Sequence, residues 1–317
     1  MEVVTKCVNK IRARALNRRE FRQFLVDLNE DFGELLLYCE VRWLSQGNML
    51  ARFWKLKRCV LQFLRENFIN ELPVECEQLA DDEWLNDFAF LVDITQHLND
   101  LNVKLQGSDN LFTDLYGHVA AFKVKLRLFI GQLTQKRLDN FTYLKSRKDE
   151  SNIDCDKYAS QIEILLEAFV SRFSDFSSDA MNVTLFSNPF AVTVEQIDLL
   201  APELQLEVID LQQNSVLKAL FTTMQNTRTV AEVCSFWRAL PVAHFSKLRS
   251  FAQRMISRFG STYRCEQSFS TMKIIKSKDR SRLRDSNLKN LLTLATTKVE
   301  PEITKLASRK QVHHNYH

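Results

Sequence analysis

The sequence predicts a mainly α-helical protein, and three observations lead to this fold class. Glycine and proline occur only 6 and 5 times in 317 residues, far below their average usage, so residues that break helices are scarce. Apolar residues recur at spacings of three and four along most of the chain, which is the helical period. The hydrophobic share of 45%, with 23 phenylalanines, is sufficient for a sizeable core in one large domain or two.

The first third of the chain is predicted to contain helices and one strand. Residues 1–30 form two helices, the second with Asn17 as its N-cap. Residues 34–43 are the best strand candidate, because aromatic and aliphatic residues cluster there and stop before Ser45-Gln-Gly. A helix is expected from Ser45 to about residue 70, and another starts after a cap at Asp81 or Asp82.

The middle of the chain carries the clearest helical pattern. A helix opening at Ser108 or Asn110 places apolar residues in steps of four and three, a heptad seam that packs against a neighbouring helix or a partner; these residues are Leu115, Val119, Phe122, Leu126, Phe129 and Leu133. Residues 145–152 are expected to be a polar hinge before a helix over 158–176. Ser177 to Pro189 is expected to be the main internal loop.

The last third is predicted to hold shorter helices and a tail. The helices are expected at 195–200, 203–212, 214–225, 230–239, 245–259, 266–276 and 286–299. Pro301 would start a last short helix, and the histidines near the end lie in a frayed tail.

Cysteine usage and the amino end indicate an intracellular, soluble protein. The seven cysteines form no Cys-x-x-Cys pair, and their odd number is typical of reduced thiols. The first residues are charged, so no signal peptide is expected, and no apolar run approaches the roughly 20 residues of a membrane span. No metal site, cofactor or small-molecule substrate is expected.

Charge is distributed unevenly along the chain. Residues 66–100 carry ten acids and no lysine or arginine, which is typical of solvated helix faces. Residues 238–289 carry thirteen lysines and arginines against three acids. That basic stretch is either a solvated linker between helices or a surface that contacts phosphates and gains affinity by releasing counterions.

Two ordered groups of motifs resemble a known superfamily. The first is Glu40-Val-Arg-Trp-Leu-Ser45, followed by Met49-Leu50 and Leu56-Lys57. The second runs from Phe236-Trp237 through Ser261-Thr-Tyr263 and Cys265-Glu-Gln267 to Met272. Together they resemble the hAT transposase superfamily. Within it the sequence is most similar to host proteins of transposon origin, namely the general transcription factor II-I repeat domain-containing, SCAN-domain and BED-zinc-finger transposase-like group. The motifs shared with that group are Glu40–Ser45, the stretch from Trp84 to Thr95, and Ser261–Gln267.

The resemblance implies a ribonuclease-H-like nuclease core interrupted by a helical insertion. On this basis residues 1–45 are a residual ribonuclease-H-like segment, 46–235 the helical insertion domain, 236–300 the C-terminal dimerisation region and 301–317 a tail. The expected fold is therefore mainly α, with a partial α/β core contributed by both ends. Arg42, Trp43 and Trp237 belong to the family signature, and both tryptophans are interpreted as core anchors rather than stacking platforms.

The resemblance also implies an incomplete catalytic site. Such nucleases hold two metal ions about 4 Å apart with several carboxylates, and Glu266 matches only the third family acid. The first two acids and the Cys-x-x-His element that follows them are expected upstream of Met1, as is any BED zinc finger. The usual Ser-Glu-Arg is Cys265-Glu266-Gln267 here. Glu266 is thus interpreted as vestigial, a helix-start residue, and the chain as no enzyme by itself.

The remaining site candidates concern association and DNA. Candidates for contact with DNA phosphates are Lys273, Lys276, Lys278, Arg280, Arg282 and Arg284. Candidates for the core or a dimer interface, two roles that are compatible, are Phe269, Met272, Leu283, Leu288, Leu291, Leu292 and Ala295.

The sequence therefore predicts a catalytically incomplete, transposase-derived protein. It would act in the nucleus, or otherwise in the cytoplasm, by dimerising with itself or a related protein, with weak nonspecific contact to DNA. Two alternatives stay open: a transcriptional or chromatin regulator that binds DNA through its basic C-terminal face, and a fragment of an active hAT transposase.

Overall fold

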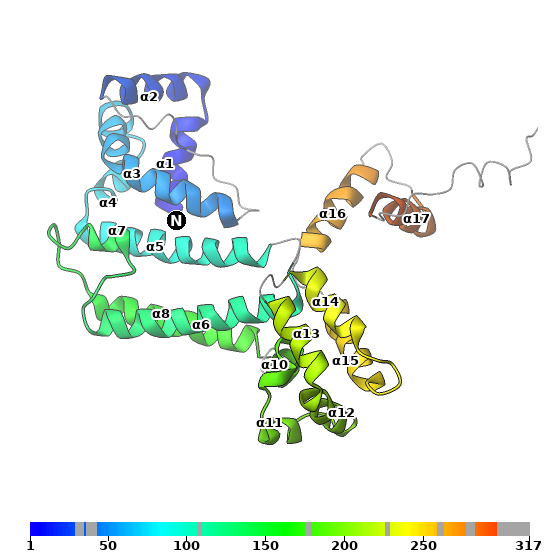
Figure 1. Ribbon diagram of the computed structural model, residues 1–317. Helices are drawn as coiled ribbons and strands as arrows, with labels where there is room; N and C mark the ends of the chain where they lie inside the picture. The colour runs from blue at the N-terminus through cyan, green and yellow to red at the C-terminus, as the bar shows by residue number, and fades with distance from the viewer. Residues whose placement is uncertain are drawn as a thin grey trace, which may run out of the picture. The chain divides into compact units, whose positions relative to one another are not determined.

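The computed structural model describes residues 1–28, 35, 43–106, 110–174, 179–225, 229–258, 263–276 and 283–296. Every regular element in these ranges is helical (Figure 1). The chain divides into two compact units, Met1–Ser261 and Thr262–His317. Within the first unit, the buried apolar residues form two separate clusters.

The first cluster begins with four helices at the amino end. These are α1 (Glu2–Arg12), α2 (Ala15–Asp27), α3 (Trp43–Phe68) and α4 (Pro73–Gln78), and α1 contacts the other three. The predicted stripe of α1 is buried, with Val4, Val8 and Ile11 at most 1% exposed. Phe21 of α2 packs edge-on against Phe63 of α3, with ring centroids 5.1 Å apart.

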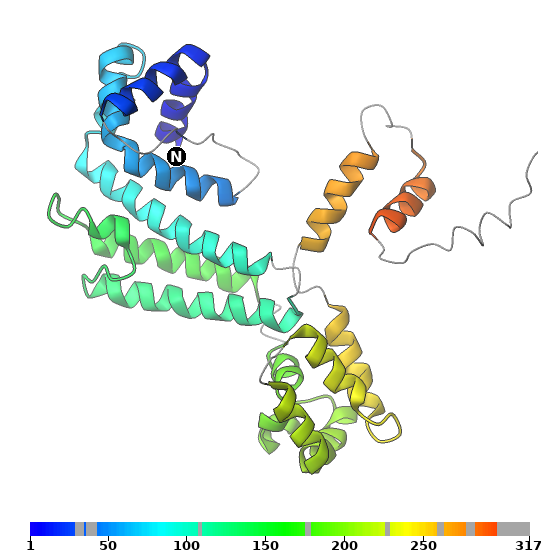
Figure 2. The same cartoon turned by 45° about the horizontal axis from the view of Figure 1, so that its top comes forward.

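Four more helices complete this cluster. They are α5 (Asp82–Leu105), α6 (Phe112–Thr134), the short α7 (Thr142–Lys145) and α8 (Cys155–Arg172). Helices α5, α6 and α8 lie side by side in both views (Figures 1 and 2). The predicted seam of α6 is buried from Val119 to Leu133 and faces α8, where Phe122 contacts Phe169 at 5.1 Å between centroids. The prediction that this seam packs on a neighbouring helix is confirmed.

The second cluster is built from short helices. These are α10 (Ala180–Ser187), a 3-10 turn (Pro189–Ala191), α11 (Val194–Asp198), α12 (Pro202–Gln213), α13 (Ser215–Gln225), α14 (Val230–Ala239) and α15 (Ser246–Ser257). Proline opens the 3-10 turn and α12, since its missing N–H is not needed in a first helical turn. Leu185, Val208, Leu211 and Leu248 are fully buried here.

The second unit contains two described helices, α16 (Tyr263–Ile275) and α17 (Asp285–Thr296), which contact each other. The helices predicted at 266–276 and 286–299 correspond to them. The predicted tail, 301–317, lies outside the described residues.

The mainly helical fold class is confirmed, whereas its α/β part is not supported. No strand occurs in the ranges that the structure describes. Of the predicted strand 34–43, Trp43 begins helix α3, and the other residues except Leu35 lie outside those ranges. The domain boundaries predicted at residues 45, 235 and 300 stay predictions.

Two asparagines predicted as N-caps act at the opposite end of a helix. Helix α2 begins at Ala15, and Asn17 lies inside it, donating its amide to the Lys10 carbonyl 3.0 Å away. Similarly, the Asn110 amide donates to the Lys104 carbonyl at 2.7 Å. Carbonyls in the last turn of a helix lack partners within it, so each asparagine closes the helix that precedes it.

The prediction of a loop from Ser177 to Pro189 was wrong for its central part. Residues 180–187 form α10, and Val183, Leu185 and Phe186 are buried. A helix of only two turns is too short to show a helical period in sequence. Helix α10 ends before Asn188, whose side-chain oxygen accepts from the Phe190 N–H at 3.1 Å.

Candidate protein-interaction surface

Helices α16 and α17 carry apolar side chains that their own packing does not cover. Phe269 and Ile274 on α16 are 60% and 80% exposed, and Leu294 on α17 is 62% exposed. The other predicted interface residues are half-buried, apart from the exposed Ala295; they are Met272, Leu283, Leu288, Leu291 and Leu292. None of the residues 269–276 and 283–295 is fully buried.

This exposure is physically unfavourable for an isolated helix pair. An amphipathic helix buries its apolar stripe against another element, and two short helices offer each other only one face. Exposed apolar side chains on one small unit make that unit a candidate for an interaction site. We define Phe269, Ile274 and Leu294, with the half-buried residues between them, as the C-terminal apolar surface.

Some of the basic candidates fall within the described residues of this unit. Lys273, Lys276 and Arg284 are exposed, as is Lys289 of α17. Lys278, Arg280 and Arg282 lie outside the described residues. Several cations on the same small unit give it the charge that phosphate contact requires.

The family-signature residues are distributed over separate parts of the fold. Glu266 lies in the first turn of α16, and Trp43 is the first residue of α3, but neither side chain is described. Arg42 lies outside the described residues. Trp237 on α14 is only 2% exposed and stacks on Phe186 of α10, with centroids 5.5 Å apart.

A buried arginine connects residues 145–152, which were predicted to be a polar hinge, to helix α5. Arg147 is 4% exposed and donates through Nε to the Asn86 side-chain oxygen at 3.2 Å. Its other guanidinium nitrogens pair with Asp82 and Glu150. Ser151 also donates to the Asn86 oxygen, at 2.8 Å. This network could not be predicted from sequence, because Arg147 stands in a charged run that is typical of a solvated segment.

A buried carboxylate holds the start of α7. Asp93 of α5 is 4% exposed and accepts from the backbone N–H groups of Tyr143 and Leu144 at 3.1 and 2.9 Å. Burial raises the pKa of Asp93 to about 6, and these backbone hydrogen bonds offset only part of that effect. The same burial, with the nearby Asp93 charge, raises the pKa of Tyr143.

The acidic stretch 66–100 makes ion pairs with other helices. Lys157 of α8 lies 2.8 Å from Asp87 and 3.4 Å from Glu83, and Lys6 of α1 lies 3.2 Å from Glu75. Tyr158 also donates to Asp87 at 2.8 Å. Most acids of this stretch are exposed, as the sequence predicted, while Glu75, Glu83 and Asp87 connect α4 and α5 to helices distant in sequence.

The described residues contain neither a cluster of metal-ligand side chains nor a membrane-spanning helix. No group of three or more histidine, cysteine, aspartate or glutamate side chains comes together there as metal ligands would. None of the helices in the described ranges combines the length and apolar character needed to cross a membrane. Of the cysteines described, Cys7, Cys59, Cys76 and Cys155 are buried thiols and Cys234 is half-buried.

The sequence of the amino-terminal helices matches a known family of helical domains. Residues 1–134, which cover α1 to α6, match the FAM200/GTF2IRD2 helical domain. This match includes residues 1–45, the segment for which a ribonuclease-H-like fold was expected.

Particular curated proteins are similar over most of the chain. General transcription factor II-I repeat domain-containing protein 2 of Bos taurus is 37% identical over 297 residues, which is 93% of this chain and 29% of that protein. Its Mus musculus counterpart is 37% identical over 276 residues, covering 87% and 28%. The chain thus spans less than a third of the length of these relatives. No solved structure matches it.

These similarities support the group named from the sequence motifs. The resemblance to the general transcription factor II-I repeat domain-containing proteins is confirmed as similarity along nearly the whole chain. Its wider placement in the hAT superfamily, and the likeness to SCAN-domain proteins, stay predictions.

Proposed function

We propose that this chain is a transposase-derived association module, which pairs with a second copy or a related protein through its C-terminal apolar surface. The observation that carries the proposal is the exposure of Phe269, Ile274 and Leu294 on two helices that bury no residue completely in their described parts. In a self-complementary pair the same patch serves both subunits. The similarity to the repeat domain-containing protein 2 relatives supports the derived, non-enzymatic character.

Oligomeric mass tests the association directly. The monomer mass is 37.1 kDa, and light scattering after size-exclusion chromatography should give twice that value at high protein concentration. Replacing Phe269 and Ile274 by glutamate places charges in the interface and should give the monomer mass. A monomer at every concentration in the unmodified chain contradicts the proposal.

A matched control separates association from general surface effects. Leu199, at the end of α11, and Leu206 of α12 are each 73% exposed. Their replacement by glutamate therefore adds the same two charges at exposed apolar positions. This control variant should keep the dimer mass. Loss of the dimer in both variants would contradict the assignment to α16 and α17.

The proposal assigns no strand cleavage to the chain by itself. Glu266 would serve the start of α16, since a carboxylate near a helix N-terminus is stabilised by the helix dipole. The proposal includes a partial ribonuclease-H-like core to which both ends of the chain contribute. It also includes a location in the nucleus. The relatives are named for a repeat of a general transcription factor, and this name supports the nuclear location.

A second proposed role is weak, nonspecific contact with DNA. The exposed Lys273, Lys276, Arg284 and Lys289 support it, and contacts of this kind depend on phosphate charge rather than base sequence. Replacing Lys276, Lys278, Arg280 and Arg282 by glutamate should abolish salt-sensitive binding to a labelled duplex. The same reversal at the exposed Lys125 and Arg127 of α6 is the control, and unchanged binding in the first variant would remove the DNA role.

A further inference from the structure

Helix α6 carries a second apolar stripe on the face opposite its buried seam. Its members recur in steps of four and three, which is the heptad spacing, and we define them as the outer α6 stripe: Gly117, Ala121, Val124, Leu128 and Gly131. Val124 and Leu128 at its centre are 59% and 53% exposed, and the other three residues are exposed as well. A helix that is apolar on two opposite faces is typical of one that is covered on both.

Two glycines in this stripe are not explained by the packing of the chain itself. Glycine inside a helix is unfavourable relative to alanine, and neither Gly117 nor Gly131 has the positive φ that would require it. A methyl group at either position would meet no atom within 4 Å. At Gly47 of α3, by contrast, it would clash with the Asn99 side chain of α5. Gly117 and Gly131 therefore suit the close approach of a helix from outside this chain.

The charges beside the outer α6 stripe are positive. With Ala121 and Leu128 at heptad position a, positions e and g hold Lys125 and Arg127, and both of these side chains are exposed. No e or g position between residues 118 and 134 holds an acid. Charges at these positions select the partner of a helix. A second copy of the same face would bring cations against cations, so the charges favour a partner that carries acids there.

We infer that the outer α6 stripe binds an acidic amphipathic helix of another protein. Large apolar side chains of that helix would pack over Gly117 and Gly131, while its acids would pair with Lys125 and Arg127. The stripe is roughly 21 Å long at 1.5 Å per residue, enough for two heptads of contact. This surface and its partner are distinct from the C-terminal apolar surface and from the second copy proposed to bind there.

Two designed peptides test the inference on the full chain. Both are fluorescently labelled, three heptads long and carry leucine at positions a and d. One has glutamate at every e and g position, and the other has lysine there. Fluorescence anisotropy should show that the glutamate peptide binds about tenfold more tightly, because its charges attract Lys125 and Arg127 while those of the lysine peptide repel them. Equal affinities, or no binding of the glutamate peptide, would overturn the inference.

Substitutions at exposed positions locate the peptide on α6 and leave the buried seam intact. Leu128→Glu should weaken binding of the glutamate peptide by about tenfold or more. Gly131→Gln places a polar side chain in open space, so the chain should fold as before but bind this peptide more weakly. Lys125→Glu combined with Arg127→Glu should reverse the preference in favour of the lysine peptide. An unchanged preference after this charge reversal would contradict the assignment to the outer α6 stripe.

Two controls separate this surface from the other exposed apolar positions. Leu206→Glu matches Leu128→Glu at an exposed leucine of another helix and should leave peptide binding unchanged. Phe269→Glu combined with Ile274→Glu removes the proposed dimer and should also leave peptide binding unchanged, so that either proposal can fail without the other. If this last variant stayed dimeric and lost its dimer mass only on adding Leu128→Glu, a second copy would occupy the stripe, and the inference would be wrong.

Discussion

At the scale of single residues, two buried polar side chains fix the connection between α6 and α8. Asp93 accepts from two backbone N–H groups at the start of α7, and Arg147 joins α5 to the turn that follows α7. The N–H groups of a first helical turn have no acceptors within the helix. Here the Asp93 carboxylate of α5 supplies acceptors for two of them. The short α7 depends on these two residues more than on its own four residues.

Asp93 gives stability a specific dependence on pH. Its pKa is about 6 in the folded chain against an ordinary 3.8, so the folded state holds the proton while the unfolded state releases it between pH 4 and pH 6. This contribution is complete below pH 4 and is lost as pH rises through 6, a change on the order of 3 kcal/mol. Between pH 4 and pH 6, the urea concentration at the unfolding midpoint should fall less for Asp93→Asn than for the unmodified chain. Parallel midpoint curves for the two proteins would contradict the assignment.

Within the polar segment 145–152, replacing Arg147 should lower the free energy of unfolding most. Arg147→Met leaves Asn86, Asp82 and Glu150 without their shared donor, and we expect unfolding free energy to fall by about 2–4 kcal/mol. Arg147→Lys keeps the positive charge but lacks the several N–H donors of the guanidinium. Its unfolding free energy should therefore lie between those of the unmodified chain and of Arg147→Met. The neighbouring Lys148 is exposed, and Lys148→Met should stay within about 0.5 kcal/mol. Equal effects at 147 and 148 would show that the network contributes nothing.

At the scale of elements, α6 shows how a sequence pattern becomes packing. Leu126 is fully buried in the seam facing α8, whereas Leu128 on the opposite face is 53% exposed. Leu126→Ala should therefore lower unfolding free energy by about 2–5 kcal/mol through lost contacts and a cavity. Leu128→Ala should change it by less than about 0.5 kcal/mol. Denaturant unfolding measures both, and similar losses would place the seam on another face.

The elements that could be predicted from sequence are those whose signal is local. The cap at Asp81 or Asp82 and the seam of α6 were predicted because capping and periodicity act within a few residues. Of the two aspartates Asp81 is the cap, accepting from the Trp84 N–H at 2.7 Å. Asn17 and Asn110 were assigned to the wrong helix, because the sequence does not show which of two adjacent helix ends an asparagine serves.

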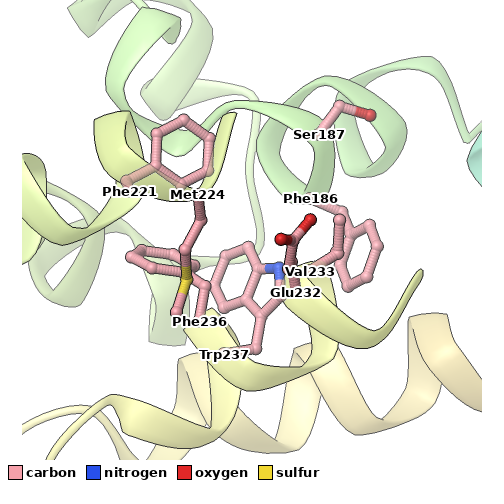
Figure 3. A pocket seen from close by; sticks show the side chains of 8 residues that line it. All are labelled: Phe186, Ser187, Phe221, Met224, Glu232, Val233, Phe236 and Trp237. Carbon is pink, nitrogen blue, oxygen red and sulfur yellow. The ribbon is translucent and has the colours of Figure 1, made fainter. Parts of the chain in front are cut away.

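The candidate site was predictable in part for the same reason. The apolar positions of 269–295 stand out locally, whereas their exposure depends on what the rest of the chain covers. The Arg147 network and the stacking of Trp237 on Phe186 (Figure 3) arise from contacts between residues far apart in sequence. No pattern of spacing carries that information, so these features needed the fold.

At the scale of the whole molecule, the first unit holds two hydrophobic clusters that share one helix. Helix α6 contributes residues 119–133 to the first cluster, while Leu111, just before it, belongs to the second. Near the same end, Arg258 lies over the Phe112 ring at 5.0 Å and pairs with Asp179 at 2.8 Å. Separate cores are expected to unfold as separate cooperative units, which a few surface contacts couple only weakly.

Denaturant unfolding should therefore show two transitions that respond to different substitutions. Leu126 and Leu248 are both fully buried, one in each cluster, and replacing either by alanine should shift only its own transition. Trp237 reports on the second cluster, whereas Trp54 and Trp84 report on the first. A chain that keeps Trp237 but carries phenylalanine at positions 43, 54 and 84 isolates one signal, and Trp237→Phe isolates the other. If both alanine variants shifted both signals equally, the two clusters would form a single cooperative unit, with α6 transmitting the loss of packing from one to the other.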